Sequence, residues 1–143
     1  MRKTFIISSV LSLLFLISCD IESSDNGKLD GFWFLNQVDS LSNGKATSLS
    51  NQRIFWSFQY DLLQLSNLED NTIIYRFGKN GNQLKLNNPC MFDRTIGDTL
   101  VTDVEVLRPY GVNSLDETFN IVTLSNSDMV LESPVLRLHF IKH

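Results

Sequence analysis

The sequence predicts an all-β domain, built as a small antiparallel up-and-down barrel of about eight strands behind a signal peptide and a short tether. Apolar and polar residues alternate in several runs of the 143-residue chain, which is the period of half-buried strands. Short segments rich in Gly, Asn, Ser and Asp separate these runs, as turns do. Closing the sheet removes its unpaired edges, which favours a barrel over the main alternative, a two-sheet sandwich.

The first 18 residues are expected to be a secretory signal peptide. Arg2 and Lys3 precede an apolar run from 5 to 15, which is typical of a signal sequence and is shorter than the roughly 20 residues of a spanning helix. Leu16-Ile17-Ser18-Cys19 follows and resembles the lipobox of bacterial lipoproteins. The resemblance implies that Cys19 is acylated, becomes the first mature residue and holds the protein at the membrane.

Residues 19–27 are interpreted as the acylated cysteine and a flexible tether. The residues after Cys19 are polar, small and acidic, which is typical of a solvated linker. Asp20 and Glu22 also resemble the sorting signals that send lipoproteins of Bacteroidetes-type bacteria to the cell surface. The sequence therefore predicts an outer-membrane lipoprotein of the cell envelope, and it leaves open whether the periplasmic or the exposed face carries it.

The predicted barrel domain, residues 28–143, contains one especially long alternating run. Residues 53–65 are expected to form a single strand of about a dozen residues. Its inward face carries Ile54, Trp56, Phe58, Tyr60 and Leu62. Residues 71–77 form the next predicted strand. Asn80-Gly81, a dipeptide that tolerates positive φ, predicts a tight hairpin into a partner strand at 83–86.

The C-terminal part of the domain is predicted as a meander. Its strands are expected at 99–107, 119–124, 129–132 and 135–142. Polar turns at 125–128 and 133–134 separate the last three of these strands. One helical turn is expected near residues 114–117.

The start of the folded region resembles the lipocalins. Gly31-Phe32-Trp33 matches the Gly-x-Trp signature of their first strand. Its spacing predicts that Trp33 and Leu35 point inward while Gly31 permits a close backbone approach. Residues 119–131 and 136–140 look like the closing strands of lipocalin-like lipoproteins from Bacteroidetes-type bacteria. The resemblance implies a lipocalin-like barrel that binds other molecules without catalysis.

The lipocalin resemblance carries further expectations. An arginine late in the chain packs on the signature tryptophan in the wider family, and the resemblance implies this place over Trp33 for Arg137. Because Arg137 stands in mid-strand, we expect it instead to be an exposed strand arginine. Residues 40–52 fit either the lipocalin loop that partly closes the barrel mouth or an ordinary surface loop. A META-type envelope domain also begins with Gly-x-Trp, but the Gly-Cys-Asn segment expected there is missing from this sequence.

Motifs for catalysis, cofactors and metals are nearly absent from the sequence. Ser42 and Lys45 match Ser-x-x-Lys by letter only, and neither Gly-x-Ser-x-Gly nor a complete phosphate loop occurs. His139 and His143 do not stand at metal-ligand spacing with Cys90 or with carboxylates. A formal net charge of −4 without a basic stripe argues against nucleic acid. We therefore expect no enzyme activity, no cofactor and no metal.

Cys90 loses its one possible intramolecular disulfide partner if Cys19 is acylated, because the chain has two cysteines. We expect Cys90 to be a small buried hydrophobe. A reactive thiolate and an intermolecular bridge are the alternatives.

An inward-facing aromatic set is the remaining candidate site. It comprises Trp56, Phe58, Tyr60, Tyr75 and Phe77, with Trp33 near the closed end of the barrel. These side chains form either a pocket for a small hydrophobic ligand, oriented by Tyr hydroxyls, or the filled core of a narrow barrel. The function predicted is a membrane-anchored lipoprotein that binds such a ligand. The alternative is a solid-core envelope lipoprotein that binds a protein or polysaccharide through its loops; the oligomeric state stays open.

Overall fold

The computed structural model describes residues 26–69, 72–93 and 95–143. The predicted signal peptide, Cys19 and the tether as far as residue 25 lie outside the described residues. Eight strands form the ring of the barrel. They are β1 (Gly31–Ser40), β3 (Phe55–Gln59), β4 (Leu62–Ser66), β5 (Thr72–Asn80), β6 (Gln83–Phe92), β8 (Glu117–Leu124), β9 (Asp128–Glu132) and β10 (Leu136–Lys142).

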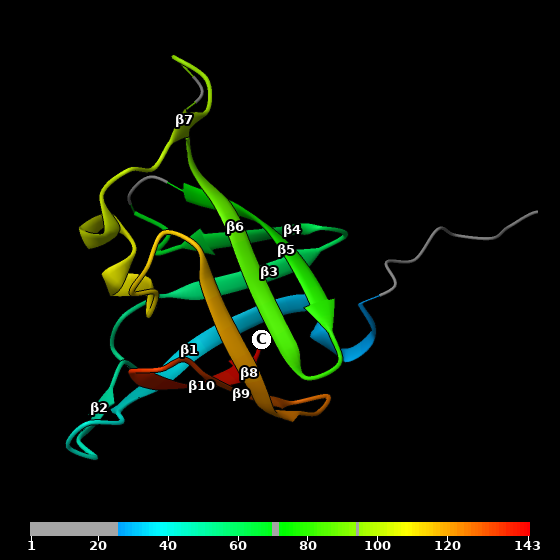
Figure 1. The fold of residues 1–143 in the computed structure, drawn as a ribbon, viewed down its shortest axis with the longest axis vertical. Helices are drawn as coiled ribbons and strands as arrows, with labels where there is room; N and C mark the ends of the chain where they lie inside the picture. Colours follow the sequence, from blue (N-terminus) through cyan, green and yellow to red (C-terminus); the bar gives the residue numbers. More distant parts are fainter. Residues whose placement is uncertain (1–25, 70–71, 94) are drawn as a thin grey trace, which may run out of the picture.

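The ring closes because the last strand pairs with the first (Figure 1). Around it the order is β1-β3-β4-β5-β6-β8-β9-β10, and every pairing is antiparallel. Two short strands, β2 (Ala46–Ser48) and β7 (Thr99–Leu100), pair with β1 and β6 as extensions of the ring. The predicted antiparallel eight-stranded barrel is confirmed.

The two ends of the barrel differ (Figure 1). A short 3-10 turn, η1 (Gly27–Leu29), lies at the closed end, where the indole Nε1 of Trp33 donates a hydrogen bond to the Leu29 carbonyl oxygen over 2.9 Å. Asn26 Nδ2 donates to the Tyr60 carbonyl oxygen over 2.6 Å, so the chain enters the barrel at this end. The opposite end, the mouth, carries the longer connections, and the strap described below lies there.

Aromatic side chains fill the centre of the ring. The largest fully buried side chains are Trp33, Trp56, Tyr75, Phe58, Phe119 and Phe140. The Trp56 ring meets Phe119 and Phe140 edge-on, with centroids 5.6 and 5.0 Å apart, which is a favoured aromatic geometry. Trp33 and Leu35 are both fully buried, which confirms their predicted inward orientation.

A strap of the chain, residues 101–116, covers the mouth. It contains two 3-10 turns, η2 (Val104–Val106) and η3 (Arg108–Tyr110). Its buried side chains, Val101, Leu107, Tyr110 and Val112, belong to the hydrophobic core. The ladder between β6 and β8 covers only residues 83–86 of β6. The two strands therefore part toward the mouth, and the strap fills the opening.

The strand predicted at 99–107 is wrong beyond Leu100. The Asp103 side chain accepts a hydrogen bond from a backbone N–H of η2, Pro109 lies in the first turn of η3, and Gly111 ends η3 with φ of 88°. Capping, a fixed proline φ and a left-handed glycine all favour turns. Here these local preferences outweigh the alternating pattern.

The strand predicted at 53–65 is in fact a hairpin. β3 and β4 are joined by a two-residue turn, Tyr60 and Asp61. Tyr60 has φ of 55° and is 55% exposed, so its predicted inward position is wrong. Paired residues of a hairpin lie on the same face of the sheet. Leu63 pairs with the inward Phe58 and is buried, whereas Leu62 pairs with the outward Gln59 and is exposed.

The remaining connections agree more closely with the sequence. The predicted hairpin after β5 is confirmed, with its loop at residues 81–82, one position later than expected. The closing meander of β8, β9 and β10 is confirmed, whereas the helical turn predicted at 114–117 is wrong because β8 begins at Glu117. Residues 40–52 contain β2, which folds back on β1. Over the described ranges, no helix has the length and apolarity to cross a membrane.

Candidate functional site

A pocket of about 310 Å³ opens at the mouth of the barrel. Three segments build it: the loop before β3, the residues after β4, and η3. Its lining residues are Asn51, Gln52, Arg53, Ile54, Asn67, Glu69, Pro109 and Tyr110. We call it the mouth pocket.

The floor of the mouth pocket is apolar and tied to the barrel. Ile54 and Tyr110 are 3% and 5% exposed. The indole Nε1 of Trp56 donates to the carbonyl oxygen of Tyr110 over 3.0 Å, and the Leu35 N–H donates to the carbonyl oxygen of Ile54 over 2.9 Å. The strap and the start of β3 therefore hold the floor in place above the aromatic core.

The rim of the mouth pocket is polar. Arg53 and Glu69 are exposed and supply one cation and one anion. Asn67 Oδ1 accepts a hydrogen bond from the Glu69 N–H over 3.1 Å, and Ser66 Oγ accepts one from the Leu68 N–H over 3.1 Å. A polar rim around an apolar floor suits a ligand with an apolar body and a few polar groups.

The aromatic residues predicted as ligand contacts lie mostly in the core. The five core members are Trp33, Trp56, Phe58, Tyr75 and Phe77, each at most 8% exposed. Phe58 and Phe77 meet edge-on with centroids 5.1 Å apart, and Trp56 and Phe58 are 6.3 Å apart. Tyr60, the sixth, lies in the exposed turn at the closed end. The mouth pocket is lined by other residues, so a role of the core aromatics in binding stays a prediction.

The hydroxyl of Tyr75 has a partner inside the protein. It donates a hydrogen bond to the Leu115 carbonyl oxygen over 2.9 Å and so ties β5 to the strap. Burial raises the pKa of Tyr75, and the nearby carboxylates of Asp116 and Glu117 raise it further. The group therefore stays a neutral hydroxyl, engaged with backbone.

The barrel with its mouth pocket has recognisable relatives. A family model described as a lipocalin-like domain matches residues 13–143. The chain belongs to this lipocalin-like family. A comparison with curated proteins gave no match.

Two solved structures share the lipocalin-like fold. One is a lipocalin-like protein from Bacteroides uniformis ATCC 8492, with a TM-score of 0.63 and 20% identity, over 82% of this chain and 100% of that chain. The other is an uncharacterized protein from Bacteroides eggerthii DSM 20697, with a TM-score of 0.55 and 15% identity, over 80% of this chain and 98% of that chain. At these identities the likeness concerns the fold alone.

The signature tryptophan of this lipocalin-like domain has a lysine, not an arginine, over its ring. Lys142 Nζ lies 5.0 Å from the Trp33 ring centroid. Arg137 instead bonds Glu132, with Nη2 2.8 Å from Oε2, and its side chain is 42% exposed; the packing on Trp33 that the resemblance implied is wrong, and the expected exposed strand arginine is closer. Gly31 has φ of 123°, and a Cβ there would lie 2.7 Å from Lys142 Cε. The flexible lysine could move aside, so the positive φ is what requires glycine at this position of the Gly-x-Trp pattern.

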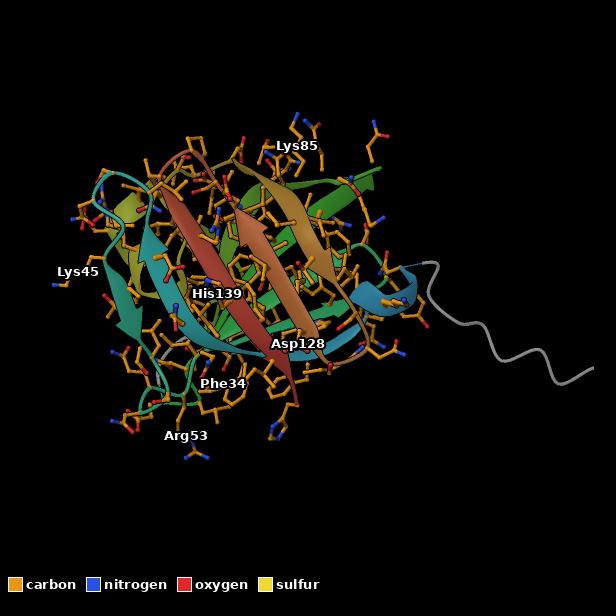
Figure 2. The ribbon with its side chains drawn as sticks, turned by 90° about the horizontal axis from the view of Figure 1, so that it is seen from below. Phe34, Lys45, Arg53, Lys85, Asp128 and His139 are labelled. Carbon is orange, nitrogen blue, oxygen red and sulfur yellow. The ribbon has the colours of Figure 1, made fainter. Side chains whose placement is uncertain are left out.

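A polar cluster on the outer face of β1 and β10 was not predicted. His139 Nε2 lies 2.7 Å from Asp39 Oδ2, and Gln37 Nε2 donates to Asp39 Oδ1 over 2.7 Å. Figure 2 shows His139 on the outer side of β10. The hydrogen bonds from Gln37 and His139 hold the pKa of Asp39 below its usual value. Only the β1–β10 pairing brings these residues together, so no local sequence signal marks them.

Cys90 is partly exposed on β6 rather than fully buried as predicted. Its Sγ lies 3.6 Å from the Asn88 carbonyl oxygen. Within the described ranges, no group of three or more His, Cys, Asp and Glu side chains is placed to hold a metal ion.

Proposed function

We propose that this protein is a lipoprotein of the bacterial cell envelope, held by acylated Cys19, whose lipocalin-like domain binds a small ligand without catalysing a reaction. The mouth pocket carries the proposal. It joins an apolar floor to a polar rim at the end of the barrel opposite the point where the chain enters. Such a combination is typical of small-molecule sites.

The size of the pocket and the packing of the core limit the ligand. A volume of about 310 Å³ is near the lower end of small-molecule pockets. Trp56 and its aromatic neighbours occupy the space beneath. The ligand is therefore a small amphipathic molecule, with its apolar part on Ile54 and Tyr110 and its polar groups toward Asn51 and Arg53.

The absence of catalysis is part of the proposal, and the chemistry of the pocket supports it. Arg53 and Glu69 are exposed side chains on the rim, whereas electrostatic catalysis works best in sites from which water is excluded. The raised pKa of Tyr75 belongs to a hydroxyl that donates to backbone in the core.

Native mass spectrometry of the full chain, released from its own envelope in mild detergent, tests this function. We expect a bound small molecule on the wild-type protein. Asn51 is exposed, so Asn51→Trp can fill the mouth pocket without disturbing the core, and this variant should lack the bound small molecule. Asn120→Trp, on the exposed face of β8, is the matched control and should retain it. A wild-type protein without an adduct, or equal retention by Asn51→Trp, contradicts the proposal.

A solid-core interaction protein is the second candidate function, and an outer aromatic cluster favours it. Phe32 and Phe55 stack with centroids 4.6 Å apart on the outer face of β1 and β3, and Phe34 lies 5.5 Å from Phe55. His143 meets Phe32 edge-on at 5.7 Å. If a protein or polysaccharide partner uses this surface, Phe34→Ser abolishes its co-purification while Asn51→Trp leaves it unchanged.

A further inference from the structure

A second pocket, which we call the side pocket, lies where the strap approaches the turns after β1 and β9. It measures about 530 Å³, and its lining includes Ser40, Leu41, Arg108, Asn113, Val135 and Leu136. None of these residues lines the mouth pocket. The two sites are therefore separate, although η3 contributes to both.

Hydrogen bonds fix the walls of the side pocket. The Leu41 N–H donates to the Val135 carbonyl oxygen over 3.0 Å and joins the turn after β1 to the turn after β9. On the strap side, the Asn113 N–H donates to Glu117 Oε2 over 3.2 Å. Val112, the neighbour of Asn113, is fully buried. The pocket is thus assembled before any ligand arrives.

Two side chains of the lining, Asn113 and Arg108, have N–H groups that can still donate hydrogen bonds to a ligand. Asn113 Nδ2 is buried and has no hydrogen-bond partner among the described residues. Such orphan donors are rare in folded proteins and call for an acceptor. Arg108 places its Nε 2.8 Å from Glu105 Oε1 and remains half exposed at the edge of the pocket, so its guanidinium can also donate to a ligand.

The side pocket has a cation in its lining although the protein is acidic, and Glu105 beside Arg108 offsets part of that positive charge. The lining contains one cation, Arg108, and no carboxylate, whereas the chain as a whole carries a formal charge of −4. Glu117 already accepts from the Asn113 N–H and from Ser114 Oγ, and it is not part of the lining. An anion is therefore favoured here over a cation.

The remaining lining is mixed: Ser40 and Ser42 contribute hydroxyls that hydrogen-bond each other, and the rest is apolar. Leu41 and Val135 are 38% and 49% exposed, and Leu136 lies beside them. One guanidinium and one amide match the two oxygens of a carboxylate. Inorganic phosphate has no hydrocarbon part and would leave Leu41, Val135 and Leu136 uncovered.

We propose that the side pocket binds a small aliphatic carboxylate. The carboxylate accepts a hydrogen bond from Arg108 and, after the Asn113 side chain turns toward the pocket, a second one from its Nδ2; the hydrocarbon part covers Leu41, Val135 and Leu136. Both a short fatty acid and the C-terminal end of a peptide present this chemistry. The site does not depend on the mouth pocket or on its ligand.

Calorimetry on the full chain in dodecyl maltoside tests the proposal with hexanoate as the probe. Hexanoate should bind with a dissociation constant in the millimolar range or below. Hexan-1-ol should bind far more weakly because it has no charge. Acetate should bind more weakly because it has almost no hydrocarbon part. Arg108→Gln is expected to weaken hexanoate binding about tenfold or more, because a charge-assisted hydrogen bond is lost. Arg53→Gln, at the mouth pocket, is the matched control and should bind hexanoate like the wild type.

Nuclear magnetic resonance supplies the second readout. The side-chain amide of Asn113 should shift on addition of hexanoate in the wild type, and Asn113→Leu should weaken binding without lowering stability. Comparison of hexanoate with N-acetylleucine distinguishes a fatty acid from a peptide end, and tighter binding of either supports the site. Equal affinity for hexanoate and hexan-1-ol, unchanged binding by Arg108→Gln, or no saturable binding overturns the proposal.

Discussion

The indole Nε1 of Trp56 donates a hydrogen bond to the carbonyl oxygen of Tyr110, a residue 54 positions later in the chain. Trp56 belongs to β3, and Tyr110 is the last residue of η3. This one bond joins the aromatic core of the barrel to the strap over its mouth. It also fixes the floor of the mouth pocket.

Replacing Trp56 by Phe is expected to loosen the strap. The substitution leaves the buried Tyr110 carbonyl oxygen without its donor, which costs about 1–3 kcal/mol of unfolding free energy. Hydrogen exchange of the amides of residues 110–112 should accelerate, and urea unfolding should show the loss. Trp33→Phe, which removes the bond to Leu29 at the closed end, should leave strap exchange unchanged. Equal strap exchange in Trp56→Phe and the wild type would contradict the assignment.

Gly111→Ala is expected to destabilise the protein more than Gly81→Ala. Gly111 has φ of 88°, and a Cβ there would lie 2.9 and 3.0 Å from the two Cδ atoms of Leu138. Left-handed strain together with this clash should cost about 2–4 kcal/mol. Gly81 has φ of 59° with no atom within 4 Å of its added Cβ, so strain alone should cost about 1 kcal/mol. Urea unfolding of both variants measures the loss of unfolding free energy. Equal losses would show that the Leu138 side chain can move aside without cost, which would contradict the prediction.

The stability contributed by Asp39 should disappear in acid. The pKa of Asp39 is lowered in the folded protein by the hydrogen bonds from Gln37 and His139. A lowered folded pKa contributes stability above the unfolded value of about 3.9, and this contribution is lost as the pH falls through the folded value. The Asp39 contribution to the difference in unfolding free energy between wild type and Asp39→Asn should be present at about pH 5 and should shrink below about pH 4. Urea unfolding across this range measures it, and a difference independent of pH would refute the linkage.

Acylation is expected to depend on Cys19 alone. Cys19→Ala should abolish incorporation of labelled fatty acid and release the protein from the membrane fraction. Cys90→Ala, which keeps the Leu16 to Cys19 pattern intact, should label like the wild type. Labelling that persists in Cys19→Ala would exclude this residue as the anchor.

The sequence predicted most of the barrel because its strands alternate clearly and its Gly-x-Trp start is distinctive. Tyr60 shows where alternation misleads: it continues the apolar pattern of β3 although it occupies a turn. The strap shows a second limit, because its apolar residues also alternate before Pro109 and Gly111 turn the chain. Both errors arise where local turn geometry competes with side-chain period.

The candidate sites were less predictable than the fold. The alternation of apolar residues along the strands marked the aromatic set. The lining of the mouth pocket instead combines residues near 52, 68 and 110, which no local pattern connects. The pairing of Asp39 with His139 likewise depends on the β1–β10 ladder, across 100 positions. Long-range register places these groups, and periodicity within one strand carries no information about it.

The hydrogen bond between Asn26 and the Tyr60 carbonyl oxygen determines which end of the barrel a membrane tether would join. Residues 19–25 reach at most about 25 Å when fully extended. A lipid on Cys19 would therefore keep the closed end within that distance of the bilayer surface. The mouth, at the other end of the barrel, would lie farther along the chain from the lipid than the closed end, and the tether would leave the barrel free to tilt.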